Sequence, residues 1–102
     1  MGWKAPTDEE GDDVIAGLLL HALEGGRVVL GRSKDCDLQV EDANVSRRHA
    51  ELRREGPDWW VVDLDSTNGT ELNGKRVSKS KLNDGDTITL GGTELVFRKV
   101  SG

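Results

Sequence analysis

Apolar and polar residues alternate along several short stretches of the chain. In one stretch, Trp60, Val62 and Leu64 fall on the same face of an extended chain and alternate with a second, half-apolar face. Residues 87–90 and 94–98 alternate in the same way. A period of two predicts β-strands at these positions.

Clusters of Gly, Asn and Asp separate the apolar runs at short intervals. Two of them, Gly91-Gly92 and Asn73-Gly74, are typical of tight β-hairpin turns because Gly and Asn tolerate positive φ angles. Short β-branched runs separated by such turn-forming clusters predict an all-β sandwich or barrel. Because the strands are short, we expect the loops to carry most of the functional residues.

Two further segments are assigned from the positions of their apolar residues. In residues 48–53, Ala50 and Leu52 are expected to face inward and the charged side chains outward. Residues 14–23 fit a helix face or a strand. Gly17 and the two-sided apolar run favour a strand.

The length of the chain allows one domain with one core. Of its 102 residues 34% are hydrophobic, with one Phe and no Tyr, so Val, Leu, Ile and a few Trp must build the core. Residues 1–13 are acidic and contain Gly and Pro, a composition that cannot bury enough apolar surface to order itself. We predict a flexible acidic tail over residues 1–13 and a folded domain over residues 14–100.

The charge balance restricts the class of partner. A formal net charge of −5 argues against nucleic-acid binding, because a duplex partner requires a basic footprint. The cations that fall within a limited span are Arg32, Lys34, Arg47, Arg48, Arg53 and Arg54. An anionic ligand would have to be met by this local basic cluster.

Cysteine content and the length of the apolar runs set the expected compartment. Cys36 is the single cysteine, which excludes an internal disulfide and fits a reducing environment. His21 and His49 lack metal-ligand spacing, so no metal is expected. The longest apolar stretch is too short for a membrane span, and the acidic N-terminus does not fit a signal peptide. We expect a cytoplasmic monomer without a cofactor.

Three polar motifs lie between the apolar runs: Gly31-Arg32-Ser33, Val45-Ser46-Arg47-Arg48-His49 and Ser66-Thr67-Asn68-Gly69-Thr70. An arginine at a strand end can hold two phosphate oxygens in parallel hydrogen bonds. The Ser46 and Thr67 hydroxyls are further donors, and the Asn68 amide can pair with any peptide backbone. His49 is expected to brace its loop through backbone groups. The combination suits a phosphate on an extended peptide, which indicates recognition and not catalysis.

In their order and separations these motifs resemble the forkhead-associated (FHA) domain. The resemblance runs from Val14 to Val100 and includes Asn83-Asp84-Gly85-Asp86-x-Ile88 leading to Gly91. It implies an all-β sandwich of about eleven short strands with the binding loops at one end. It also implies a non-catalytic module that binds phosphothreonine peptides and acts as an adaptor in Ser/Thr kinase signalling.

The resemblance assigns roles to individual residues. Those implied to contact the phosphothreonine are Arg32, Ser46, Arg47 and Thr67, and the one implied to hold the peptide backbone is Asn68. Those implied to be structural are Gly31, His49 and Gly69.

Two segments imitate other ligand sites. Residues 69–75 match the glycine and lysine spacing of a nucleotide P-loop, but Arg76 replaces the magnesium-binding Ser or Thr, and no helix pattern follows. Residues 63–69 imitate a calcium loop, but the glycine comes one place late and Gly74 stands where a bidentate Glu is needed. Both segments are better explained as turns.

A hydrolase is a third alternative, with Ser46, His49 and either Asp63 or Asp65 as its triad. Residues three apart on an extended segment point to different faces, so Ser46 and His49 would meet only if the loop curled back. No nucleophile elbow is present. Catalysis is therefore not expected.

A phosphate-independent interaction module is the main functional alternative. It would use an exposed sheet face or edge, with Trp59 or Trp3 as its anchor.

Overall fold

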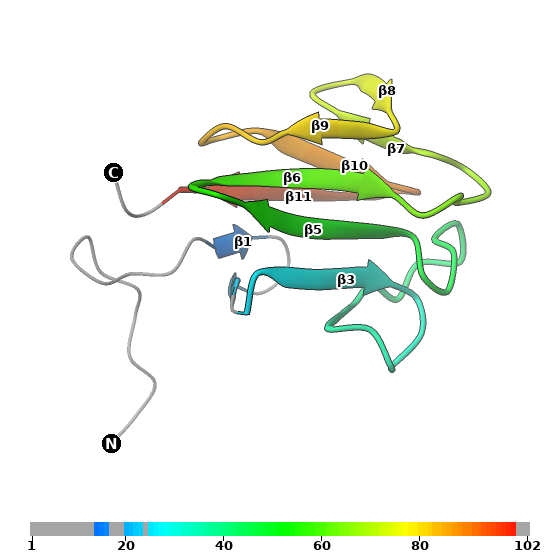
Figure 1. Ribbon diagram of the computed structural model, residues 1–102. Coiled ribbons are helices and arrows are strands. Elements are labelled where there is room, and N and C mark those ends of the chain that lie inside the picture. Colours follow the sequence, from blue (N-terminus) through cyan, green and yellow to red (C-terminus); the bar gives the residue numbers. More distant parts are fainter. Residues whose placement is uncertain (1–13, 17–19, 24, 100–102) are drawn as a thin grey trace.

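The computed structural model describes residues 14–16, 20–23 and 25–99, which form two β-sheets packed face to face (Figure 1). In spatial order, the six-stranded sheet contains β2 (Leu20–Ala22), β1 (Val14–Ala16), β11 (Thr93–Arg98), β10 (Thr87–Leu90), β7 (Thr70–Leu72) and β8 (Lys75–Val77). The five-stranded sheet contains β4 (Leu38–Gln39), β3 (Arg27–Gly31), β5 (Ala50–Glu55), β6 (Asp58–Asp63) and β9 (Lys79–Lys81). The predicted all-β sandwich of about eleven strands is confirmed.

Both predicted hairpins are present. Leu90 pairs with Thr93 across the Gly91-Gly92 turn, which joins β10 to β11. Leu72 pairs with Lys75 across the Asn73-Gly74 turn, where φ is 52° at Asn73 and 86° at Gly74. Positive φ at both central residues gives a turn whose twist matches that of the flanking strands.

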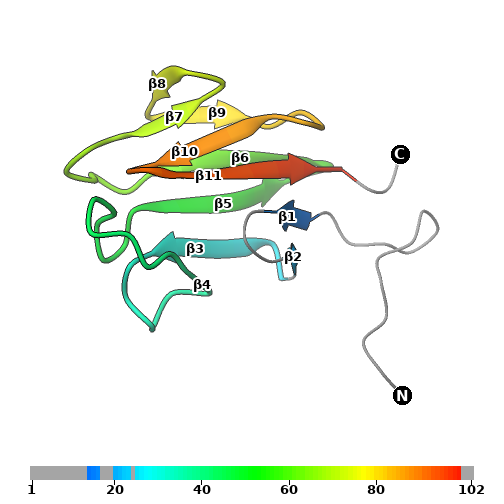
Figure 2. The same ribbon diagram turned by 180° about the vertical axis from the view of Figure 1, so that it is seen from behind.

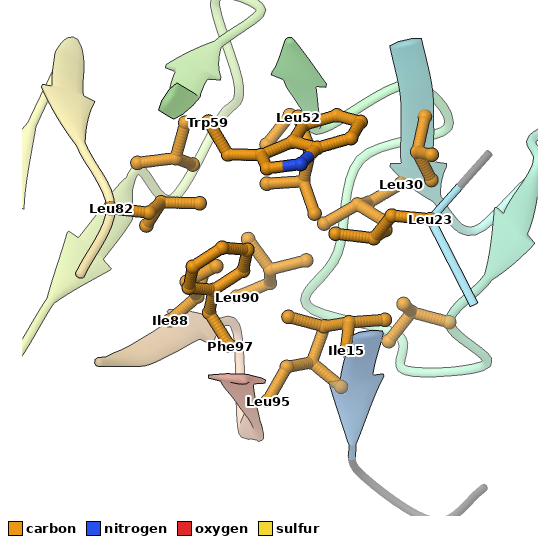
Figure 3. Packing of buried hydrophobic residues seen from close by; sticks show 14 of the residues in the cluster. Ile15, Leu23, Leu30, Leu52, Trp59, Leu82, Ile88, Leu90, Leu95 and Phe97 are labelled. Carbon is orange, nitrogen blue, oxygen red and sulfur yellow. The ribbon is translucent and has the colours of Figure 1, made fainter. Parts of the chain in front are cut away.

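The core fills the space between the two sheets (Figure 3). The buried residues that form it are Ile15, Leu23, Val28, Leu30, Val40, Val45, Ala50, Leu52, Trp59, Val61, Leu82, Ile88, Leu90, Leu95 and Phe97. Aliphatic side chains dominate this set, as the composition predicted. Burial of apolar surface between the sheets is the main force that stabilises the sandwich.

Trp59 is part of this core, and its expected role as an exposed anchor is wrong. Its exposed fraction is 2%, and Figure 3 shows the indole next to Leu52, between the sheets. The alternation in β6 identifies two faces, but Trp and Val occur on both, so the pattern does not tell which face is inside. Trp60 takes the outward position and is only half-buried. Trp3 lies outside the described residues.

The segment over residues 14–23 contains two strands and not the single strand that was expected. β1 and β2 pair antiparallel, with Val14 opposite Ala22 and Ala16 opposite Leu20. Folding back lets β1 bond to β2 on one side and to β11 on the other. A single long strand would have left more of its backbone groups without partners.

The prediction for residues 48–53 holds for the apolar positions, since Ala50 and Leu52 are fully buried. Glu51 also faces outward, as predicted, but it is only 3% exposed. The carboxylate lies on the outer face of the sheet, but Arg27 and Arg53 cover it, with their Nε atoms 2.9 and 3.3 Å from Oε1. Two cations thus satisfy a carboxylate that is almost removed from water.

Among the described residues, no helix has the length and apolar character needed to cross a bilayer.

The burial of Trp59 leads to a stability prediction. Trp59→Ala should lower the free energy of unfolding by about 3–5 kcal/mol, because it removes a large core side chain and leaves a cavity. Trp60→Ala should cost less, because Trp60 is half-buried on the outer face. Urea unfolding followed by circular dichroism measures both, and an equal loss in the two variants would contradict this placement.

Candidate functional site

Three loops meet at one end of the sandwich, at the right in Figure 1 and at the left in Figure 2. One follows β3, one leads into β5, and one joins β6 to β7. The three polar motifs identified in the sequence lie in these loops. The opposite end of the sandwich holds the start of β1 and the end of β11, where Val14 pairs with Arg98.

Arg32 follows the last residue of β3 and is fixed by its own backbone and its side chain. Its amide donates to the Ser46 carbonyl at 2.9 Å, and its Nε donates to the Val45 carbonyl at 3.1 Å. Gln39 donates its side-chain amide to the Arg32 carbonyl at 3.1 Å. Val45 is buried, so the guanidinium rests on a rigid support. Among the described residues, only Nε of the guanidinium has a hydrogen-bond partner, and the two terminal amino groups have none.

Ser46 and Thr67 meet across two loops. The Ser46 hydroxyl oxygen accepts a hydrogen bond from the Thr67 amide at 3.0 Å. Because the oxygen acts as an acceptor there, the hydroxyl hydrogen remains available for another acceptor. The structure therefore brings together Arg32, Ser46 and Thr67, which are far apart in the sequence.

Gly31 allows the first two loops to approach each other. A Cβ at this position would lie 2.1 Å from the Arg47 carbonyl oxygen, a distance that no side chain can adopt. The same carbonyl accepts hydrogen bonds from the Ser33 amide at 3.1 Å and from the Cys36 thiol at 3.0 Å. The backbone of Arg47 is thus fixed, while its side chain is exposed.

His49 is fully buried and joins two of the loops. The Ser46 amide donates to Nδ1 at 3.0 Å, so the hydrogen of the neutral ring is on Nε2, which donates to the Gly69 carbonyl at 2.8 Å. The contact between Ser46 and His49 is made by the Ser46 backbone amide, whereas the Ser46 hydroxyl bonds the Thr67 amide instead of the ring. Both ring nitrogens are occupied, so the Ser46 hydroxyl has no general base in His49.

Asp63 organises the loop between β6 and β7, a role not foreseen from the sequence. Its carboxylate accepts hydrogen bonds from the Ser66 hydroxyl at 2.5 Å, the Ser66 amide at 3.1 Å and the Thr70 hydroxyl at 2.7 Å. Burial raises the pKa of Asp63, but these bonds outweigh burial and hold it below its ordinary value. The Asp-x-x-Ser spacing, typical of side-chain-bonded turns, was the available signal.

The end of the sandwich where the three loops meet is called the rim below. Asn68 is exposed at this rim, and the neighbouring loop holds it. Its side-chain amide donates to the Asn44 carbonyl at 2.7 Å. Asp42 supports Asn44 by accepting its amide at 2.9 Å, and also accepts the Gly92 amide and the Thr93 hydroxyl, both at 2.9 Å. Bonds from Asn44, then Thr93, lower the pKa of Asp42. The turn between β10 and β11 is thus linked to the rim.

The basic cluster expected from the sequence is divided between the two ends of the sandwich. Arg32 follows the end of β3, whereas Arg53 pairs with Arg27 at the start of that strand. Arg54 lies beside Arg53, and its amide donates to the Gly26 carbonyl at 2.8 Å. Antiparallel pairing of β3 and β5 separates these cations, so only part of the cluster lies near the three loops.

The segments that imitate other ligand sites have ordinary structural roles. Residues 69–75 contain β7, its hairpin turn and the first residue of β8, and no helix follows to present backbone amides to a phosphate. The Asp63 carboxylate of the calcium-like segment is occupied by Ser66 and Thr70. Within the ranges that the structure describes, no group of three or more His, Cys, Asp or Glu side chains is placed to hold a metal ion.

Comparison with known families agrees with this architecture. Residues 28–91 match the FHA domain family over more than half of the chain. The chain belongs to the FHA domain family.

Sequence relatives include proteins of Mycobacterium and Corynebacterium. The chain is 41% identical over 78 residues to the FHA domain-containing protein FhaA of Mycobacterium tuberculosis, which covers 76% of this chain and 15% of FhaA. It is 48% identical over 67 residues to the oxoglutarate dehydrogenase inhibitor of Corynebacterium jeikeium, which covers 66% of this chain and 46% of the inhibitor. The chain thus spans less than half of the length of these relatives.

Solved FHA structures share the fold. The FhaA FHA domain in complex with the intracellular domain of Rv3910 has a TM-score of 0.81 and 35% identity, over 85% of this chain and 100% of that chain. The same TM-score and identity, over 85% and 95% of the two chains, are found for a structure from a study of phosphothreonine-dependent FHA domain interactions. Mycobacterium tuberculosis EmbR in complex with a low-affinity phosphopeptide has a TM-score of 0.86 and 28% identity, over 96% and 27%.

The lowered pKa of Asp63 leads to a pH-dependent prediction. A carboxylate whose pKa is lower in the folded than in the unfolded state stabilises the fold above the unfolded value, and this stability is lost as the pH falls through the folded value. Asp63→Asn should lower the free energy of unfolding at pH 7 by about 1.5–3 kcal/mol, the range for hydrogen bonds to a charged group.

The difference between wild type and Asp63→Asn should shrink as the pH falls below about 4, where the unfolded carboxyl protonates. Denaturant unfolding at a series of pH values measures it. Asp65→Asn is the matched control, because Asp65 is exposed in the same loop. A gap that stays constant down to the most acidic pH would contradict the role given to the Asp63 charge.

Proposed function

We propose that this domain binds phosphothreonine peptides and acts as an adaptor in Ser/Thr kinase signalling. Family membership supports the proposal, as does the match to a structure studied for phosphothreonine-dependent FHA interactions. Relatives of known role include a dehydrogenase inhibitor and the glycogen accumulation regulator GarA of Mycolicibacterium smegmatis. Both names describe regulators, which fits a module that acts by binding.

The convergence of Arg32, Ser46 and Thr67 carries this proposal. The Ser46 residue links the other two, because its carbonyl accepts the Arg32 amide at 2.9 Å and its hydroxyl oxygen accepts the Thr67 amide at 3.0 Å. In our proposal the Arg32 guanidinium and the Ser46 and Thr67 hydroxyls contact the phosphate, and the exposed Arg47 adds positive charge. Asn68 pairs with the peptide backbone through the hydrogen-bonding groups that Asn44 does not use.

Phosphorylation would act as the switch for binding. A phosphothreonine carries a charge of about −1.5 to −2 and gains charge-assisted hydrogen bonds that threonine cannot form. Gly31, His49 and Gly69 act indirectly in this proposal, by holding the loops that present these donors. Because hydrogen bonds within the protein already fix these loops, binding of the peptide costs little further conformational entropy.

The remaining features of the proposal concern the molecule as a whole. We propose that residues 14–100 form the binding domain, that residues 1–13 form a tail, and that the domain works as a monomer in the cytoplasm. It is proposed to be non-catalytic and to need no cofactor or metal. The engagement of both His49 ring nitrogens supports a non-catalytic role, since a Ser-His pair would need one of them free.

The phosphate-independent alternative is now best represented by Trp60. Its indole is half-buried on the outer face of the five-stranded sheet, where Lys79 Nζ lies 5.1 Å from the ring centroid. The Trp60 Nε1 atom is buried and has no hydrogen-bond partner in the part of the chain that the structure describes. An interface on this face would bind the same peptide equally well with and without the phosphate.

An oriented peptide library separates the two functions. The same library is tested twice, once with phosphothreonine and once with threonine at the fixed position. We expect binding only to the phosphorylated library, because the charge of the phosphate is what the arginine and hydroxyl groups recognise. Equal enrichment in the two libraries would favour the alternative on the Trp60 face.

Replacement of Arg32 tests the proposed site directly. Arg32→Ala should weaken binding of the preferred phosphothreonine peptide at least about 30-fold, because truncating one partner of a hydrogen-bonded charge pair costs about 2–5 kcal/mol. Isothermal titration calorimetry gives the affinity, and circular dichroism checks the fold. Arg54→Ala removes an exposed arginine at the other end of the sandwich and should leave binding intact. Unchanged affinity in Arg32→Ala would refute the site.

A further inference from the structure

Arg76 lies beside the loop that carries Thr67 and Asn68, although nothing in its sequence context assigned it to the site. It is an exposed residue of β8. A Cβ placed on Gly69 would lie 2.6 Å from Arg76 Nε, 2.8 Å from Cζ and 3.0 Å from Nη2. The guanidinium therefore lies directly over the backbone of Gly69, the residue that follows Asn68 in the chain.

The charge of Arg76 is not used within the described part of the protein. Glu71 is its cross-strand partner on β7, a position from which an ion pair could form. No ion pair forms between them, and the guanidinium is turned to Gly69 instead. Other cations of the two sheets do reach carboxylates, as in the pairs Arg27–Glu51, Lys79–Glu55, Lys81–Asp58 and Arg98–Asp84.

The location of Arg76 defines which part of a ligand it can meet. The Ser46 carbonyl accepts the Arg32 amide, the Ser46 hydroxyl oxygen accepts the Thr67 amide, and Arg76 lies over Gly69, the residue that follows Asn68. A peptide whose phosphate sits between Arg32 and Thr67, and whose backbone pairs with Asn68, has a flank that continues toward this guanidinium.

We propose that Arg76 is a specificity-determining residue that binds an anionic side chain in the flank of the phosphothreonine peptide. The ligand chemistry is a carboxylate of Asp or Glu, or a second phosphate, because both match the two parallel donors of a guanidinium. The inference rests on the proposed function and deepens it. It gives the domain a preference for acidic sequence next to the phosphothreonine.

The test uses a peptide series with one phosphothreonine in a neutral background. Ala, Asp, Lys or phosphoserine is placed in turn at each position within about four residues, a span that an extended chain at about 3.3 Å per residue brings within reach. Fluorescence anisotropy gives each affinity. At one position Asp should improve the affinity of the wild-type domain roughly 3- to 5-fold over Ala, as expected for an exposed ion pair. Phosphoserine there tests the second source of negative charge.

Variants of Arg76 assign the preference to this side chain. Arg76→Ala should lose the gain from Asp and bind the Ala peptide within about two-fold of wild type. Arg76→Glu should bind the Lys peptide better than the Asp peptide, an inversion that loss of structure cannot produce. Lys75→Ala removes a cation from the same hairpin and should retain the wild-type preference.

Two outcomes would overturn the inference while leaving the proposed function in place. One is a wild-type domain that binds the Ala phosphopeptide but gains from no acidic position. The other is a gain from Asp or phosphoserine that persists in Arg76→Ala. Failure of the wild-type domain to bind any phosphothreonine peptide of the series is a different result, since it removes the proposed function itself.

Discussion

The end of the sandwich where the three polar loops meet depends on one buried imidazole. His49 accepts the Ser46 amide on one ring nitrogen and donates to the Gly69 carbonyl from the other. Its own backbone bonds Leu30 on β3 and Leu64 after β6. Because the ring is fully buried, loss of either bond would leave a polar group without a partner in the core. This requirement holds loops from distant parts of the sequence in a fixed relation.

Side chains at the rim keep hydrogen-bonding capacity for a ligand because mainly backbone groups hold the loops together. The close approach of Arg47 to Gly31 needs no side chain at all, and the Ser46 hydroxyl uses only its acceptor capacity on Thr67. Asp63 and Asp42 bind backbone amides and hydroxyl groups, and neither carboxylate neutralises the arginines of the rim. The resulting surface combines rigid positions with unused positive charge, the combination that favours an anionic ligand.

Several elements of the fold could be predicted from local chemistry. The Asn73-Gly74 and Gly91-Gly92 hairpins follow from the φ preferences of their turn residues, and the alternation in β10 and β11 matches the observed strands. The burial of Trp59 could not be predicted, because both faces of β6 carry apolar side chains. The burial of Glu51 could not be predicted for another reason: it depends on Arg27, which lies on a different strand.

The sequence by itself determined the strand-forming character of the chain, its main turns and the kinds of chemical group in the three polar motifs. Only the tertiary structure decided which of these groups share a site. It places Arg32 beside Ser46 and Thr67, Arg53 at the opposite end of the sandwich, and Arg76 beside the rim. The physical reason is that strand order and register are set by packing and hydrogen bonding between distant segments, which no local pattern encodes.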